Sequence, residues 1–168
     1  PIEELLFRVA NGEVSGAYTW RAFGLKVGVS TTVLDDISEI PSTTTIPTPD
    51  GIQLAVKSSS ANDASAGTGV RSVDIHYLDR SYDERSETVF TNGTSMVFTN
   101  GTTIHRIQSF HTKTAGSGGL AAGNVSLKKT DNTTTYSYIK AGGNQSLTAM
   151  HTIPRGKSGY LINWHSGM

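Results

Sequence analysis

Cysteine is absent from this 168-residue chain, which excludes disulfide bonds and thiolate metal sites without fixing the compartment. Charge is also scarce, since only 17% of residues are charged and 14 basic residues balance 14 acidic ones. A balanced chain has no long-range field to attract nucleic acid or an anionic membrane, so we expect neither as a partner. No apolar run approaches the roughly 20 residues of a membrane-spanning helix, and no signal peptide is recognisable.

Threonine, serine and glycine are abundant, with 22, 19 and 18 copies. Threonine favours strands, whereas serine and glycine favour turns and loops. The chain is long enough to bury one good core without covalent staples. The composition therefore indicates a soluble β-rich domain with many turns.

Short β-like runs follow one another from Gly51 onward, separated by turn signals and without helical patterns between them. This arrangement predicts an all-β fold, an antiparallel β-sandwich or jelly-roll-like domain over residues 51–168. In residues 71–79, Val73, Ile75 and Tyr77 alternate with Asp74, His76 and Leu78, which predicts one buried face. The candidate strands are 52–58, 71–79, 86–91, 94–99, 103–112, 124–129, 134–141, 146–153 and 159–165.

The N-terminal residues 1–12 predict a short amphipathic helix, because apolar residues recur at helical spacing and an Asn-Gly pair follows them. Two interpretations are open: the helix caps the core of its own domain, or it is an arm that docks on another subunit. Further along, Pro41, Pro47 and Pro49 exclude a central strand. We therefore expect residues 1–50 to form a short helix and an extended Pro/Thr-rich arm.

The sequence Val-Phe-Thr-Asn-Gly-Thr occurs twice, at residues 89–94 and 97–102. Asn-Gly between alternating runs is a strong hairpin signal, so the two copies predict two-residue turns in a three-stranded meander. Large apolar residues then fall on both faces of the meander. Either the second turn shifts the register, or a second layer or a neighbouring subunit covers both faces.

Two loops could carry chemistry, and each also has an ordinary explanation. The glycine-rich residues 116–124 resemble a dinucleotide-binding loop, but a strand pattern follows where a phosphate-binding helix is required. Residues 79–87 contain four acids that could hold calcium weakly, but they lack the spacing of a calcium loop and include two arginines. We interpret both segments as loops between strands.

Histidines and aromatic residues complete the list of candidates. None of the five histidines forms a metal pair at i, i+4, although strands can bring distant histidines together. No nucleophile elbow or paired acids stand out, so we expect no enzyme activity, no metal site and no cofactor. Aromatic residues could line a sugar- or peptide-binding surface, or could belong to the core and to subunit contacts: Tyr18, Trp20, Phe23, Tyr136, Tyr138, Tyr160 and Trp164.

Three passages together resemble structural proteins of tailed-bacteriophage virions. Residues 58–94 contain an Ala-Asn-Asp-x-x-Ala-Gly-Thr-Gly loop, an alternating strand that ends in Leu-Asp, and then Ser-Glu-Thr and an Asn-Gly-Thr turn. Residues 146–167 contain a strand pattern, a Pro-x-Gly-Lys turn and a second strand pattern, and residues 5–24 are similar to the start of these proteins. Such proteins commonly continue with further strands after that turn. A C-terminal strand is thus expected to be missing or supplied by a neighbour.

The resemblance implies a decoration (cement) protein that stabilises the capsid exterior, is made in the host cytoplasm, and binds the major capsid protein and copies of itself. A neck, collar or tail component is an alternative within the same class. A carbohydrate-binding module on the virion, with a glycan as partner, is an alternative from another class. Residues 15–49 are the expected contact segment, and the candidate capsid or subunit contacts are Leu5, Leu6, Tyr18, Trp20, Phe23 and Ile46.

Overall fold

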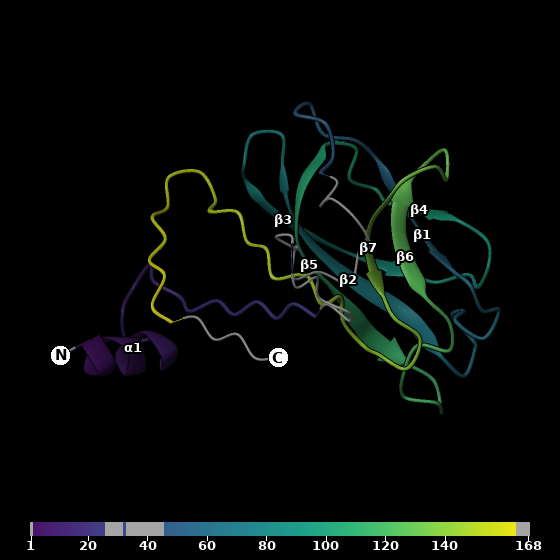
Figure 1. Ribbon diagram of the computed structural model, residues 1–168, viewed down its shortest axis with the longest axis horizontal. Helices are drawn as coiled ribbons and strands as arrows, with labels where there is room; N and C mark the ends of the chain where they lie inside the picture. The colour runs from purple at the N-terminus through teal and green to yellow at the C-terminus, as the bar shows by residue number, and fades with distance from the viewer. Residues whose placement is uncertain (1, 26–31, 33–45, 164–168) are drawn as a thin grey trace.

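The computed structural model of the chain describes residues 2–25, 32 and 46–163 (Figure 1). Within these residues the chain forms one helix and seven strands. In chain order they are α1 (Ile2–Ala10), β1 (Leu54–Ser58), β2 (Val70–Asp79), β3 (Glu84–Phe90), β4 (Val97–Phe98), β5 (Ile104–Ala115), β6 (Val125–Lys129) and β7 (Thr135–Ile139).

The strands form two antiparallel sheets, one of four strands in the order β4-β1-β6-β7 and one of three in the order β3-β2-β5. Both sheets contribute to one apolar core, whose members include Val56 and Leu127 from the first sheet and Ile75 and Phe110 from the second. The protein is therefore an all-β sandwich with a short N-terminal helix, as the sequence predicts (Figure 1).

The alternation in β2 places its core residues as expected, because Val73, Ile75 and Tyr77 are buried. Alternation fails in β1, where Ala55 is as buried as Leu54 and Val56 on either side of it. Ala55 is paired with Phe98 on one side and Lys128 on the other. Directly paired residues share a face of the sheet, so these two large neighbours shield the small alanine.

Seven of the candidate strands are confirmed, whereas the predictions for residues 146–153 and for the described part of 159–165 are wrong. Ser146 N donates to Phe110 O beside β5 at 2.8 Å, but the chain then bonds locally, with Met150 N donating to Thr148 O. A turn follows at residues 154–157, where Gly156 adopts a φ of 74°. The segment makes only isolated backbone bonds to its neighbours, such as Leu25 N to Leu147 O, so no regular ladder forms among the described residues.

The predicted meander of the duplicated sequence is also wrong, because its first copy ends β3 and its second copy forms β4 in the other sheet. Val89 pairs with Val73 of β2, while Val97 pairs with Val56 of β1. Both explanations for the apolar faces, a shifted register and a doubly covered meander, assumed one sheet and so do not apply. Instead Phe90 and Phe98 remain 64% and 53% exposed.

The two Asn-Gly pairs adopt different structures and make different contacts. In the first copy Gly93 has a φ of 60°, and Ser95 N donates to Asn92 O at 3.1 Å, which closes a tight turn between the sheets. In the second copy Asn100 N and Gly101 N both donate to Glu87 Oε2, at 3.1 and 2.9 Å. The second Asn-Gly is thus a binding loop for a carboxylate of β3.

Candidate functional site

The N-terminal helix is specified locally at both ends. Glu3 and Glu4 lie in the first turn, where carboxylates favour the positive end of the helix dipole. At the other end Gly12 has a φ of 73°, with Gly12 N donating to Val9 O and Glu13 N to Arg8 O. These two bonds form a Schellman motif, which requires a left-handed residue and so favours glycine.

Among the residues of helix α1 whose side chains the structure describes, none belongs to the sandwich core, and Figure 1 shows the helix set apart from the sheets. Leu5 and Phe7 are 51% and 67% exposed. The interpretation that the helix caps the core of its own domain is therefore wrong. Docking on another subunit remains a prediction, with an apolar helix surface that fits it.

Residues 13–25 leave the helix without regular secondary structure and run beside the C-terminal segment (Figure 1). The rings of Trp20 and His151 stack, with centroids 3.9 Å apart and an interplanar angle of 28°. Leu25 N donates to Leu147 O at 3.4 Å, and the Tyr18 hydroxyl donates to Glu84 Oε1 at 3.3 Å. The arm is thus fastened to the sandwich mainly through aromatic side chains.

The six candidate contacts all lie at or near the surface, but the structure does not gather them into one patch. One of them, Leu6, is half-buried, and the others are exposed: Leu5, Tyr18, Trp20, Phe23 and Ile46. Trp20 and Phe23 line a cavity of about 100 Å³ beside β5 and β7, together with Phe110, Tyr136 and Met150. Most of the expected contact segment 15–49, including Pro41, lies outside the described residues.

The contact between Trp20 and His151 is expected to depend on pH. Burial lowers the pKa of His151, and the nearby Glu84 only partly opposes that effect. A histidine whose folded pKa lies below its unfolded value of about 6.5 stabilises the folded state less as pH falls through that window. The contact should therefore hold at pH 7.5 and loosen toward pH 5.5.

Nuclear magnetic resonance of the Trp20 indole, assigned with Trp20→Phe, checks this expectation. The resonance should titrate with an apparent pKa below that of a free histidine. His151→Phe keeps an aromatic ring without a titrating group, and so should abolish the change. A titration that persists unaltered in His151→Phe would contradict the assignment.

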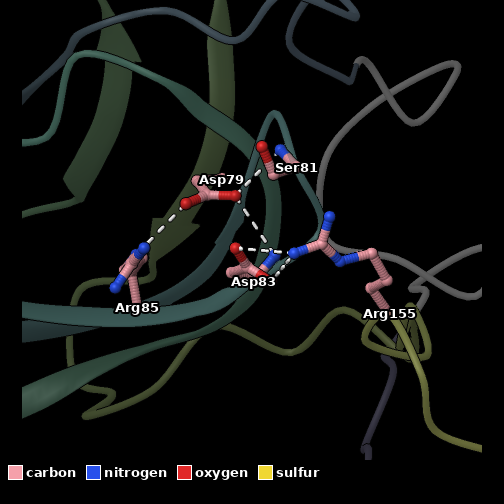
Figure 2. A network of polar contacts seen from close by, with 5 residues as sticks. All are labelled: Asp79, Ser81, Asp83, Arg85 and Arg155. Atoms are coloured by element: carbon pink, nitrogen blue, oxygen red, sulfur yellow. Dashed lines mark hydrogen bonds and ion pairs between the residues drawn. The ribbon is translucent and has the colours of Figure 1, made fainter.

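The four acids of residues 79–87 are each engaged by groups of the protein itself. Figure 2 shows the contacts of two of them, Asp79 and Asp83. Asp79 accepts from Ser81 N at 2.8 Å and Asp83 N at 3.1 Å, and its other oxygen accepts from Arg85 Nε at 3.1 Å. Asp83 accepts from Arg155 Nη2 at 3.0 Å. The remaining two, Glu84 and Glu87, accept from Tyr18 and from the Asn100-Gly101 loop. These contacts support the interpretation as a polar loop between strands.

Asp63 is a fully buried carboxylate that joins three segments of the chain. Its oxygens accept from Ser58 Oγ at 2.6 Å, Val70 N at 2.8 Å, and Ala122 N and Gly123 N at 2.9 Å each. The glycine-rich loop 116–124 therefore binds an anion, but the anion is this internal carboxylate. Strand β6 follows the loop, as expected for a connection between strands.

The close approach of the Asp63 carboxylate to the backbone of residue 69 requires glycine at that position. A Cβ atom at Gly69 would lie 2.1 Å from Asp63 Oδ1 and 3.0 Å from the Cβ of Ala122. Any side chain at this position would collide with the carboxylate. The Asp and the last Gly of the Ala-Asn-Asp-x-x-Ala-Gly-Thr-Gly loop are thus explained by packing.

A second cluster, Asp74, His76 and His111, lies on the face of the three-stranded sheet opposite the core; we call it the Asp-His-His cluster. Asp74 of the central strand β2 pairs directly with His111 of β5, and His76 follows two residues later on the same face. The two imidazole rings are nearly parallel, 5.6 Å apart at 13°. One nitrogen or oxygen of each residue lies within 4.8 Å of the others.

The charges in the Asp-His-His cluster follow from its surroundings. Partial burial acts to raise the pKa of Asp74, but hydrogen bonds from Thr88 and Lys113 outweigh it, so the pKa lies below its ordinary value. Burial and the neighbouring His76 lower the pKa of His111. At neutral pH the cluster therefore presents a carboxylate and a neutral imidazole at His111.

Sequence reasoning missed this cluster because His76 and His111 are separated by the whole of β3, β4 and the start of β5. The available signal was an Asp-x-His pair on the polar face of an alternating strand. The buried His105 has a structural explanation, because its ring nitrogens contact Thr48 O at 2.9 Å and the Tyr82 hydroxyl at 3.2 Å. His165 and Trp164 lie outside the described residues.

Comparison with protein-family models, with curated proteins and with solved structures finds no match for this chain. Among the residues that the structure describes, no helix is long and apolar enough to cross a membrane.

Proposed function

We propose that the protein is a non-enzymatic structural component of a tailed-phage virion, which binds the capsid exterior through helix α1 and the arm that follows it. The resemblance of residues 5–24, 58–94 and 146–167 to virion structural proteins supports this class. The observation that carries the proposal is a well-formed amphipathic helix that lies apart from the sandwich core, with Leu5 exposed and Leu6 half-buried.

A helix of this kind gains stability when a partner covers its apolar face. Fully burying a side chain such as that of Leu5 contributes about 1.5–3 kcal/mol. Exposed apolar patches on soluble proteins commonly mark interaction sites. The absence of a strong net charge fits a partner recognised through shape and apolar contact, such as a capsid shell or another copy of this chain.

The cavity beside β5 and β7 favours a role in assembly and argues against catalysis on a small molecule. Its volume of about 100 Å³ is smaller than the roughly 300–1,000 Å³ of typical ligand pockets. The acids of residues 79–87 and Asp63 are held by internal donors, as described above. These groups serve the fold and are not presented to a substrate.

The test uses purified particles of the phage that encodes the chain. Wild-type protein should be present in the particles, and after removal it should bind again. The double variant Leu5→Asp/Leu6→Asp should bind at least about a hundredfold more weakly, because both leucines of the proposed contact are lost. Unaltered circular dichroism would show that the sandwich of the variant remains folded.

Leu120→Asp is the matched control, since Leu120 is also an exposed leucine but lies in the loop between β5 and β6. It should bind like the wild type. If the wild-type protein is not part of the particle, the proposed function is wrong. If the double variant and the control bind equally well, the role of α1 is wrong.

The position of the protein in the particle separates decoration from the alternatives. Many symmetric copies over the shell would support decoration, and a single ring at one vertex would support a neck or collar component. The carbohydrate-binding alternative is favoured by the aromatic residues Trp20, Phe23 and Tyr136 around the cavity. Glycan-array binding that is lost on Trp20→Ala would support it, and an array without signal would exclude it for the glycans tested.

A further inference from the structure

We propose that the Asp-His-His cluster binds a divalent transition-metal ion such as Zn²⁺ on the outer face of the sheet formed by β3, β2 and β5. Three potential ligand atoms already lie within 4.8 Å of one another. In a tetrahedral zinc site, bonds of 2.0–2.1 Å place neighbouring ligand atoms about 3.4 Å apart. Rotation of side chains is enough to close this difference, because His76 is exposed and its ring is not confined by the core.

The ligand set selects the type of metal. Imidazole nitrogens combined with a carboxylate oxygen suit Zn²⁺ and its neighbours in the first transition series. Calcium and magnesium prefer oxygen ligands, and the two histidines offer none. Three protein ligands on an exposed face leave the fourth position to water, as in zinc sites with an open coordination position.

The ligand atoms are free to bind. Within the described part of the chain, no protein group forms a hydrogen bond with the ring nitrogens of His76 or His111. The Thr88 hydroxyl donates to Asp74 Oδ1 at 2.6 Å, and Lys113 Nζ lies 3.2 Å from the same oxygen. These contacts orient the carboxylate and leave Oδ2 for the metal, which is the common arrangement around protein-bound zinc.

Lys113 opposes binding of a metal ion. Its ammonium group occupies the space beside Asp74 and repels a second cation. The side chain of Lys113 is 49% exposed, so it can move into solvent when the metal binds. Replacing Lys113 by methionine should therefore raise the affinity for Zn²⁺ severalfold.

Isothermal titration calorimetry of the untagged protein with ZnCl₂ tests the proposal, since a histidine tag would itself bind the metal. One Zn²⁺ per chain should bind to the wild type. His76→Ala and His111→Ala should each weaken binding at least about tenfold. Losing even a residue that only hydrogen-bonds to a metal ligand reduces metal affinity by about that factor. Asp74→Asn should weaken it comparably, and Lys113→Met should strengthen it.

His151→Ala is the matched control, because this histidine stacks on Trp20 and is not one of the three grouped ligands, so its loss should leave the affinity for Zn²⁺ unchanged. Absorption of the Co²⁺-loaded protein between about 500 and 650 nm should show the intense bands of a low-coordinate nitrogen and oxygen site. No binding of Zn²⁺, or equal affinity in His76→Ala and the wild type, would overturn the proposal. Equal loss in His151→Ala would overturn it as well.

Discussion

Replacing Asp63 by alanine is expected to lower the free energy of unfolding by about 3–5 kcal/mol. The substitution leaves four donors without their acceptor: the Ser58 hydroxyl and the backbone amides of Val70, Ala122 and Gly123. Each unsatisfied buried donor costs about 1–3 kcal/mol, and water has poor access to a fully buried site. The loss is large because one side chain holds two strands and a loop together.

Urea denaturation followed by circular dichroism measures this effect. Asp63→Asn should be intermediate, because the amide keeps one acceptor oxygen but turns two N–H donors toward the same amides. Asp50→Ala is the control, since Asp50 is exposed in a turn before β1 and should change stability by no more than about 0.5 kcal/mol. A loss below about 1 kcal/mol for Asp63→Ala would show that the carboxylate does not hold these segments together.

Replacing Phe110 by alanine should cost about 3–5 kcal/mol through lost burial and the cavity that remains. Phe110 is 1% exposed and is the largest fully buried side chain in the described part of the chain. It pairs with Ile75 of β2 and packs in the core shared by both sheets. Because both sheets pack around this ring, little collapse can fill the space.

The duplicated sequence supplies matched controls for Phe110. Phe90→Ala and Phe98→Ala remove the same side chain from positions that are 64% and 53% exposed, so each should cost much less than Phe110→Ala, and Phe98→Ala the more of the two because its ring covers Ala55. Chemical denaturation of all three variants under one set of conditions gives the comparison. Similar losses at all three positions would mean that Phe90 and Phe98 are covered in solution.

The sequence predicts most of the sandwich because apolar residues alternate along much of its strands, although Ala55 and Leu78 are buried where period two predicts exposure. The burial of Val73, Ile75 and Tyr77 is predicted correctly from their alternation with polar residues. The turn signals correctly separate seven strands. The helix is likewise read correctly from its spacing and from Asn11-Gly12. These features are local, so no knowledge of distant contacts is needed to identify them.

The pairing of strands is not local, and there the prediction fails. Both copies of Val-Phe-Thr-Asn-Gly-Thr carry the same hairpin signal, yet only the first forms a tight turn. Glu87 recruits the amides of the second copy, and Gly93 N of the first donates to Asp63 O. Identical sequences therefore differ in structure because their tertiary partners differ, which overrides turn propensity.

The candidate site shows the same limit. Asp74 and His111 face each other only because β2 and β5 are neighbours in the sheet, with β3 on the other side of β2. Nothing in the spacing of the histidines along the chain reveals this. The role of Asp63 could not be predicted from the sequence either. The backbone amides of residues 122 and 123 that donate to it lie about sixty positions further along the chain.

The borders of the three-stranded sheet determine how copies of this protein can associate. Strand β3 is a border strand, and its charged Glu84, Arg85 and Glu87 discourage the addition of a foreign strand. At the opposite border, residues 144–146 bond to β5 through Thr112 N and Ser146 N. Strand addition from a neighbour, and fibre growth with it, is thereby disfavoured along these borders. At these two borders, contacts between copies would depend on side chains.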